Sequence, residues 1–217
     1  MPASEIMYLI FDIGGTKTRI AVSKNGRRFS GFKIIPTPKK FSEGIKAIKN
    51  AAEKLSGGKK FKAVCGGVAG ALNREKSFLV GGPNISGWIK KPLKKELAKI
   101  FRAPVFLEND AALTGLGEVW YGAAKGKKIA VFITVSTGVG GSRIVNGKID
   151  ANFFGFEPGH QILDIGACSG KICKDSYLLN RISGSAIKTR FNKKPEEISC
   201  KKIKDDLSRW LAIGLNN

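Results

Sequence analysis

The sequence predicts an α/β protein of two lobes, and two observations lead to this prediction. Strands and helices alternate along the first half of the 217-residue chain, which is typical of a mixed sheet covered by helices. A unit of strand, glycine turn and strand, "FDIGGTKTRIAVSKNGR", then recurs in the second half as "ITVSTGVGGSRIVNGKI". Chance recurrence of glycine turns is the alternative. We expect a duplicated fold with lobes at residues 1–122 and 123–217.

The expected elements of the first half follow from apolar spacing and turn residues. Apolar runs at 8–12 and 18–23 predict two antiparallel strands, and Asn25-Gly26 predicts a type I′ turn into a third strand. Apolar residues at helical spacing over 41–55 predict a helix that Gly57-Gly58 ends. The remaining expected elements are a strand at 61–66, a helix at 93–101, a strand at 105–107 and a helix at 111–121.

The second half begins like the first and then differs from it. Strands are expected at 128–134 and 142–145, with a turn at Asn146-Gly147. Only helical segments follow, at 176–192, 195–203 and 206–217. We therefore expect the second lobe to be incomplete, with apolar surface on its sheet left uncovered.

Charge and hydropathy narrow the classes of function. The formal charge of +21 comes from lysines that are scattered along the chain in twos and threes, without an arginine-rich arm, so a solvated basic surface is favoured over specific nucleic-acid binding. A salt-dependent attraction to polyanions remains as an alternative. No run reaches the roughly 20 apolar residues of a membrane span, and no secretory leader is recognisable, so we expect a cytoplasmic protein without a membrane association.

Both glycine turns have the residues of phosphate-binding loops. Glycines let backbone amides approach a ligand closely, and such turns can cradle phosphate. Asp12, at the end of the first strand, is a candidate to hold Mg²⁺ beside the phosphates. An ordinary tight hairpin is the alternative interpretation, and neither a P-loop nor a dinucleotide motif is present. The candidate residues are Asp12, Gly14, Gly15, Thr16, Lys17, Thr137 and Gly138.

A carboxylate between the two turns is the candidate general base. "FLENDAAL", residues 106–113, places Glu108, Asn109 and Asp110 where a strand ends and a helix begins. Capping of the following helix is a simpler explanation for the presence of Asn109 or Asp110. A rigidly held carboxylate suits the removal of a hydroxyl proton during phosphoryl transfer, and Asp110 is our candidate. Asn84 in "GGPNISGW" has an amide that suits vicinal sugar hydroxyls, although a turn residue is the simpler interpretation.

Five motifs in order, "DIGGTKT", "GGPNISGW", "ENDAAL", "STGVGG" and "FEPGH", resemble the ROK family of repressors, open reading frames and sugar kinases. The resemblance covers residues 8–160. It implies the ribonuclease H-like lobes of the actin/hexokinase/Hsp70 superfamily and a glucokinase-like enzyme. Such an enzyme uses ATP and Mg²⁺ to phosphorylate a hexose, usually at C6, and a homodimer is implied.

The resemblance also assigns roles to individual residues. It makes Asp110 the catalytic base and matches the glycine turns to the two phosphate loops. The implied sugar-binding residues are Asn84, Asn109, Asp110, Glu157 and His160.

The sequence departs from the family pattern in its second half. Many members bind zinc with a histidine and three cysteines, but here Gly166 replaces the first cysteine and leaves His160, Cys168 and Cys173. Because a structural zinc site normally has four ligands, we consider zinc doubtful unless Cys200 or water completes the set, and we expect a loop without metal. The strands that cover adenosine in the family are not recognisable. An inactive sugar-binding module therefore remains the alternative to a kinase. Because few residues precede Tyr8, we do not expect the DNA-binding module of the family's repressors.

Overall fold

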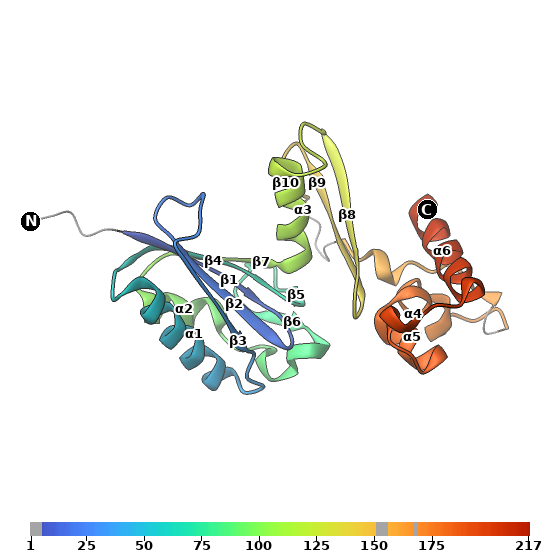
Figure 1. The fold of residues 1–217 in the computed structure, drawn as a ribbon, viewed down its shortest axis with the longest axis horizontal. Helices are drawn as coiled ribbons and strands as arrows, with labels where there is room; N and C mark the ends of the chain where they lie inside the picture. The colour runs from blue at the N-terminus through green and yellow to red at the C-terminus, as the bar shows by residue number, and fades with distance from the viewer. Residues whose placement is uncertain (1–5, 151–155, 167–168) are drawn as a thin grey trace, which may run out of the picture. The chain divides into compact units, whose positions relative to one another are not determined.

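A computed structural model describes residues 6–150, 156–166 and 169–217, apart from the side chains of Pro83 and Asn84 (Figure 1). The chain divides into two compact units, Met1–Leu113 and Thr114–Asn217, which we call unit 1 and unit 2. The division falls inside α3 (Asp110–Tyr121). None of the helices formed by these residues is long and apolar enough to cross a membrane.

Unit 1 contains a mixed sheet with the strand order β3-β2-β1-β4-β7. Strands β1, β4 and β7 are parallel, while β2 and β3 add an antiparallel hairpin at one side. This arrangement confirms the expected mixed sheet. The bounds are Met7–Ile13 for β1, Lys17–Ser23 for β2, Gly31–Pro36 for β3, Phe61–Val68 for β4 and Val105–Asn109 for β7. Two short strands, β5 (Ala71–Leu72) and β6 (Leu79–Gly81), form a separate ribbon.

Two helices cover the sheet of unit 1 and close its core (Figure 1). As predicted, α1 spans Phe41–Ser56 and α2 spans Leu93–Phe101, and Gly57 ends α1 in the left-handed conformation with φ 59°. The apolar faces of both helices pack against alternating residues of the strands, so the core is continuous. Fully buried members include Leu9, Ile20, Ile48, Val64 and Leu97.

Trp88 anchors a short 3-10 helix, η1 (Pro83–Trp88), to this core. Its side chain is only 1% exposed and meets the Phe41 ring edge-on, with 5.4 Å between ring centroids. Gly44 on α1 has no room for a side chain, because the Trp88 ring occupies the place of a Cβ atom. The glycine in α1 therefore allows the loop that carries η1 to pack closely on the helix.

Unit 2 begins with an antiparallel sheet in the order β10-β9-β8. Strand β8 spans Ile129–Val135, β9 spans Val139–Val145 and β10 spans Lys148–Ile149. Asn146 and Gly147 form the predicted two-residue turn, with φ values of 50° and 73°. The corresponding prediction in unit 1 was wrong, because β2 and β3 are separated by residues 24–30. There the Asn25 Oδ1 accepts hydrogen bonds from the amides of Arg27 (2.9 Å) and Arg28 (3.1 Å), which organise a longer loop.

Helices follow the sheet of unit 2, as expected. A single helix, α6, spans Lys201–Asn216, whereas the sequence predicted separate helices at 195–203 and 206–217. Residues Pro195–Glu197 form only a 3-10 turn, η5. The other helical segments are η2 (Pro158–His160), η4 (Lys174–Ser176), α4 (Leu179–Ile182) and α5 (Gly184–Phe191).

The core of unit 2 is small. Val139, Leu178 and Ile182 form its buried centre, against which Trp210 of α6 packs. The Arg181 guanidinium lies over the Trp210 ring at 4.4 Å from its centroid, which suits a cation–π contact. On β8, Ile129 is 60% exposed and Val131 is 51% exposed, so apolar surface remains uncovered on this sheet, as the sequence predicted.

Candidate functional site

The first glycine turn connects β1 to β2 and is held by a threonine at the end of the hairpin. The Gly14 N–H donates to the Lys17 carbonyl at 3.0 Å and closes the turn. The Thr37 N–H donates to the Thr16 carbonyl (3.0 Å), and the Thr37 hydroxyl donates to the Gly14 carbonyl (2.7 Å). The same hydroxyl lies 2.8 Å from that of Thr18. Three hydrogen bonds from one residue therefore fix the candidate phosphate loop.

Close packing, and not a left-handed backbone, explains the glycine at position 14. The backbone of Gly14 is outside the left-handed region. A Cβ atom at this position would lie 3.0 Å from the Lys17 carbonyl, so any side chain would strain the turn. The backbone can stay compact here only because the side chain is missing.

The carboxyl ends of the parallel strands bring two acidic residues to one edge of the sheet. Asp12 on β1 is in register with Gly67 on β4, which is in register with Glu108 on β7. Asp110 follows directly, as the first residue of α3. A Cβ atom on Gly67 would lie 3.3 Å from the Asp110 Cα, so this glycine lets the start of α3 pack on β4. Asp12 and Asp110 are therefore neighbours in unit 1.

Asn109, and not Asp110, has the geometry of the residue that caps α3. The Asn109 Oδ1 accepts a hydrogen bond from the Ala112 N–H at 3.0 Å, the usual geometry of a helix N-cap. Its Nδ2 donates to the Gly70 carbonyl at 3.1 Å. The capping interpretation thus applies to Asn109, and a sugar contact by this side chain stays a prediction.

The surroundings of Asp110 change the pKa of its carboxyl group. Partial burial raises the pKa of the Asp110 carboxyl above its ordinary value, and the negative charge of Asp12 adds to the rise. A hydrogen bond from the Ala111 N–H to Oδ1, at 2.9 Å, acts in the opposite direction and lowers this pKa. A carboxyl with a raised pKa binds a proton more readily, which is the property that a general base needs.

The neighbouring acidic groups are paired with cations. The Arg19 guanidinium lies 2.7 Å from the Asp12 carboxylate, in a partly exposed ion pair. Glu108 on β7 lies 2.6 Å from the Lys76 ammonium, so this ion pair joins the loop between β5 and β6 to β7. The Asp12 carboxylate stays partly exposed in its pair with Arg19, so Asp12 remains the candidate to hold Mg²⁺.

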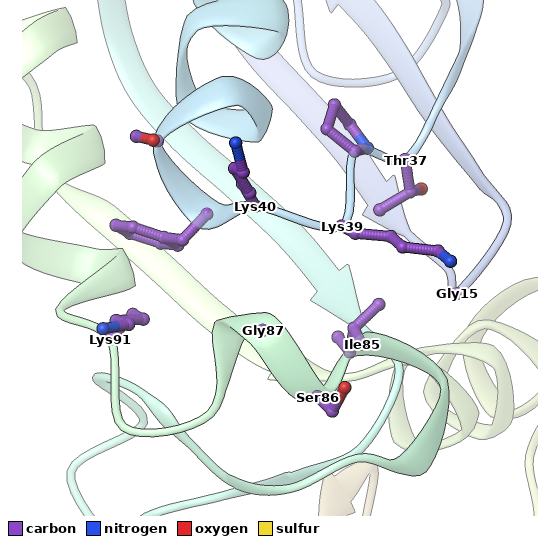
Figure 2. Close-up of a pocket in the computed structure, with 11 residues that line it drawn as sticks. Gly15, Thr37, Lys39, Lys40, Ile85, Ser86, Gly87 and Lys91 are labelled. Carbon is purple, nitrogen blue, oxygen red and sulfur yellow. The ribbon is translucent and has the colours of Figure 1, made fainter.

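A pocket of about 640 Å³ opens beside the first glycine turn (Figure 2). One wall is the segment from Thr37 to Ser42, the other is residues 85–87 of η1, and Gly15 reaches it from the turn. The Trp88 Nε1 donates to the Pro38 carbonyl at 2.9 Å and joins the two walls. Gly87 approaches the Lys39 carbonyl so closely that a side chain at this position would clash with it.

Sequence reasoning missed three contributors to this region. Thr37 anchors the glycine turn, and Lys39 and Lys91 line the pocket, whereas Lys17 is not among its lining residues. Lys39 and Lys40 are among the scattered lysines that were interpreted as basic surface. Their position directly before α1 is the sequence feature that could have indicated a binding role for them. The backbone of Asn84 belongs to η1, but its side chain lies outside the described residues, so its predicted sugar contact stays a prediction.

The second glycine turn, in unit 2, is held from behind by a helix. The Gly184 N–H donates to the Ser136 carbonyl at 2.7 Å, and the Ser185 N–H donates to the Thr137 carbonyl at 3.2 Å. Both donors belong to the first turn of α5. Thr137 and Gly138 are exposed, and a Cβ atom built on Gly138 would meet nothing within 4 Å. The turn therefore has open space in which a ligand can approach its backbone.

Glu157 and His160 lie near the second turn, in the same unit. Gly159 between them packs directly against the Val139 backbone, one residue beyond the turn. The His160 Nδ1 lies 3.6 Å from the Glu157 Oε2, and the His160 ring contacts that of Tyr177 with 6.3 Å between centroids. Unit 2 thus contains the candidates Thr137, Gly138, Glu157 and His160, and unit 1 contains Asp12, the first turn, Asn109 and Asp110.

The candidate zinc ligands are described only in part. Cys168 lies outside the described residues. Cys173 is disulfide-bonded, so its sulfur is not the thiolate that zinc requires. Among the side chains that the structure describes, no three histidines, cysteines or carboxylates form a metal-binding group. The doubt about zinc stays a prediction.

Comparisons with known proteins extend these observations. The chain is 35% identical over 192 residues to a glucokinase from Streptomyces coelicolor, covering 85% of this chain and 60% of that protein. It is 31% identical over 196 residues to an N-acetyl-D-glucosamine kinase from Histophilus somni, covering 81% of this chain and 63% of that protein. The chain thus spans about 60% of the length of the glucokinase.

Solved structures confirm the fold. A ROK hexokinase from Thermus thermophilus matches with a TM-score of 0.79 at 28% identity, covering 97% of this chain and 76% of that one. A ROK family glucokinase from Streptomyces griseus, solved with glucose and AMPPNP, matches with a TM-score of 0.75 at 27% identity, covering 96% and 78% of the two chains. The fold is therefore of the duplicated, ribonuclease H-like type of the hexokinases. Residues 8–209 match the ROK family, and the chain belongs to this family.

Proposed function

We propose that this chain is a hexose kinase that transfers the γ-phosphoryl group of ATP to a sugar hydroxyl. The observation that carries the proposal is the state of Asp110. Asp110 lies at the carboxyl edge of the parallel strands, and Asn109 is the residue that caps α3. Partial burial and the negative charge of Asp12 raise the pKa of the Asp110 carboxyl. In the proposed reaction, Asp110 accepts the proton of the attacking hydroxyl, and the rigid start of α3 holds it in position.

The two glycine turns are the proposed phosphate loops. The compact first turn and the open tip of the second, at Thr137 and Gly138, both suit contacts from backbone amides to phosphate oxygens. Mg²⁺, when bound, would neutralise phosphate charge. Asp12 is its proposed ligand, and the partial exposure of the Asp12–Arg19 ion pair leaves that carboxylate accessible to solvent.

Glu157 and His160 are the proposed sugar-binding groups of unit 2, together with Asn84 and Asn109 of unit 1. A carboxylate and an imidazole can together accept and donate hydrogen bonds to neighbouring hydroxyls. The similarity to a glucokinase and to an N-acetyl-D-glucosamine kinase supports glucose or an N-acetylated hexosamine as the hexose. A cytoplasmic homodimer without a specific nucleic-acid partner completes the proposal.

A coupled assay for ADP release, with Mg-ATP and a panel of hexoses, tests this function. We expect sugar-dependent turnover that Asp110→Asn reduces by about 10²–10⁴-fold, the usual contribution of a general base. Asp205→Asn on α6 is the matched control, because Asp205 is an exposed carboxylate in unit 2, and it should leave turnover unchanged.

Two outcomes would contradict the proposal. Full activity in Asp110→Asn would remove Asp110 as the base. A folded protein that binds a hexose in a direct titration, but does not release ADP with any sugar, would instead favour a catalytically inactive sugar-binding module.

A further inference from the structure

The pocket beside the first glycine turn has a consistent chemical character. Its 11 lining residues include three lysines, Lys39, Lys40 and Lys91, and no aspartate or glutamate. Hydroxyl groups of Thr37, Ser42 and Ser86 and the backbone of Gly15 add hydrogen-bonding groups. A cavity with this lining attracts anions that also accept hydrogen bonds.

The three lysines differ in what they contact. Lys40 lies 3.5 Å from Glu43 on α1, so its charge is partly compensated. Lys39 and Lys91 form no ion pair with any of the residues that the structure describes. In Figure 2 the side chain of Lys39 extends toward Gly15, whereas those of Lys40 and Lys91 point in other directions. Lys39 is therefore the uncompensated cation on the side of the glycine turn.

The walls of the pocket are held firmly, which a binding site requires. Thr37 is hydrogen-bonded to the turn through Gly14 and Thr16, and Pro38 is hydrogen-bonded to Trp88. Gly87 packs on the backbone of Lys39 itself. The backbone that carries Lys39 is thus fixed on both sides, and only its exposed side chain must be ordered when a ligand binds.

We propose that this pocket binds a phosphate group and that Lys39, in place of Lys17, supplies the positive charge next to the first glycine turn. Lysine is a common phosphate ligand that acts as a point charge, and Gly15 leaves room for an oxygen to approach the backbone. The proposal rests on the proposed function for its choice of ligand, since a phosphorylated donor and a phosphorylated sugar share the chemistry that the pocket recognises. Lys39 then positions that group and selects phosphorylated ligands over neutral ones.

Calorimetric titration at low salt tests the site directly, without turnover. The probes are ADP, glucose 6-phosphate and inorganic tripolyphosphate, and they distinguish a donor, a product and an unattached phosphate chain. We expect at least one probe to bind, with an affinity that falls about tenfold or more in Lys39→Ala and recovers in Lys39→Arg. The Lys46→Ala variant removes the same charge from an exposed lysine of α1 that does not line the pocket, and it should change the affinity less than twofold.

The outcomes separate this proposal from the proposed function. Equal weakening by Lys39→Ala and Lys46→Ala would mean that only the general basic charge attracts phosphates, and would overturn the site. Absence of binding by all three probes would overturn it as well. If Asp110→Asn abolishes turnover while Lys39→Ala changes neither KM value nor kcat, the proposed kinase function holds and the proposed Lys39 site is wrong. If binding depends on Lys39 but no sugar gives turnover, the proposed Lys39 site holds and the proposed kinase function is wrong.

Discussion

The two glycine turns have the same order of strand, turn and strand, but they are held by different means. In unit 1 the Thr37 side chain and backbone bind the turn from the end of the neighbouring hairpin. In unit 2 the first amides of α5, at Gly184 and Ser185, bind the carbonyls of the turn. A short sequence can therefore encode the turn, while its support comes from whichever element happens to pack behind it.

The surroundings of the two turns differ just as much. The strand before the first turn, β1, is central in its sheet, and every second residue from Met7 to Ile13 is buried. The strand before the second turn, β8, is at the edge of its sheet, and Ile129 and Val131 on it are exposed. Burial is thus decided by neighbouring strands and helices, and not by the apolar character of the strand itself.

The largest expected difference between the units concerns their tryptophans. Trp88→Ala should lower the free energy of unfolding of unit 1 by about 3–5 kcal/mol, because the side chain is fully buried and its removal leaves a cavity. Trp120→Ala, which removes a 56% exposed side chain in unit 2, should cost less than about 1 kcal/mol. Urea denaturation of both variants measures the two values. Similar losses would show that the contrast in burial has no energetic consequence.

The anchor of the first turn should have the next largest effect. Thr37→Val removes the hydroxyl that donates to the Gly14 carbonyl and meets that of Thr18, so about 1–3 kcal/mol of stability should be lost. Thermal denaturation measures the loss. Thr189→Val, at an exposed position of α5, is the matched control and should change the melting temperature little. An unchanged Thr37→Val protein would mean that the backbone bond to Thr16 holds the turn alone.

The support of the second turn should be weaker. Ser183 caps α5 by accepting a hydrogen bond from the Ala186 N–H at 3.1 Å, and α5 in turn holds Ser136 and Thr137. Ser183→Ala should cost about 1 kcal/mol, the typical value for an N-cap. Ser208→Ala in the exposed middle of α6 should be neutral or slightly stabilising. If Ser183→Ala cost as much as Thr37→Val, the two anchors would be equivalent.

The smallest expected effect is the pH dependence of stability at Asp110. Because its folded pKa is raised above 3.8, the folded state binds more protons than the unfolded state just above that pH. The contribution of Asp110 to stability is therefore full at low pH and is lost as the pH rises through the folded pKa. The stability of Asp110→Asn relative to the unmodified protein should increase from about pH 4 and then level off. A constant difference across this range, in urea denaturation, would contradict the raised pKa.

Much of the fold was predictable because its signals are local. The helices at Phe41–Ser56 and Leu93–Phe101 follow from apolar spacing, and Gly57 ends the first of them. The Asn-Gly signal predicted one two-residue turn correctly, at Asn146-Gly147, and failed at Asn25-Gly26. In the failed case the Asn25 side chain binds the amides that follow it, which stabilises a longer loop.

The candidate site was predictable only in part. Asp110 and the residues of both glycine turns are candidates because of their order along the chain, since each comes directly after a predicted strand. The division of roles between Asn109 and Asp110 was left open by the sequence. Only the hydrogen bond from Ala112 to Asn109 decided which of the two caps α3.

By itself, the sequence determined the duplicated strand–turn–strand units, the alternation of strands and helices, and the family, because these depend on short patterns and their order. Only the tertiary structure decided that Thr37 anchors the first turn, that Trp88 joins the walls of the pocket, and that Lys39 lies beside Gly15 where Lys17 was expected to act. These contacts join residues that are distant in the chain. No local pattern specifies them, because they depend on which surfaces the packed core brings together.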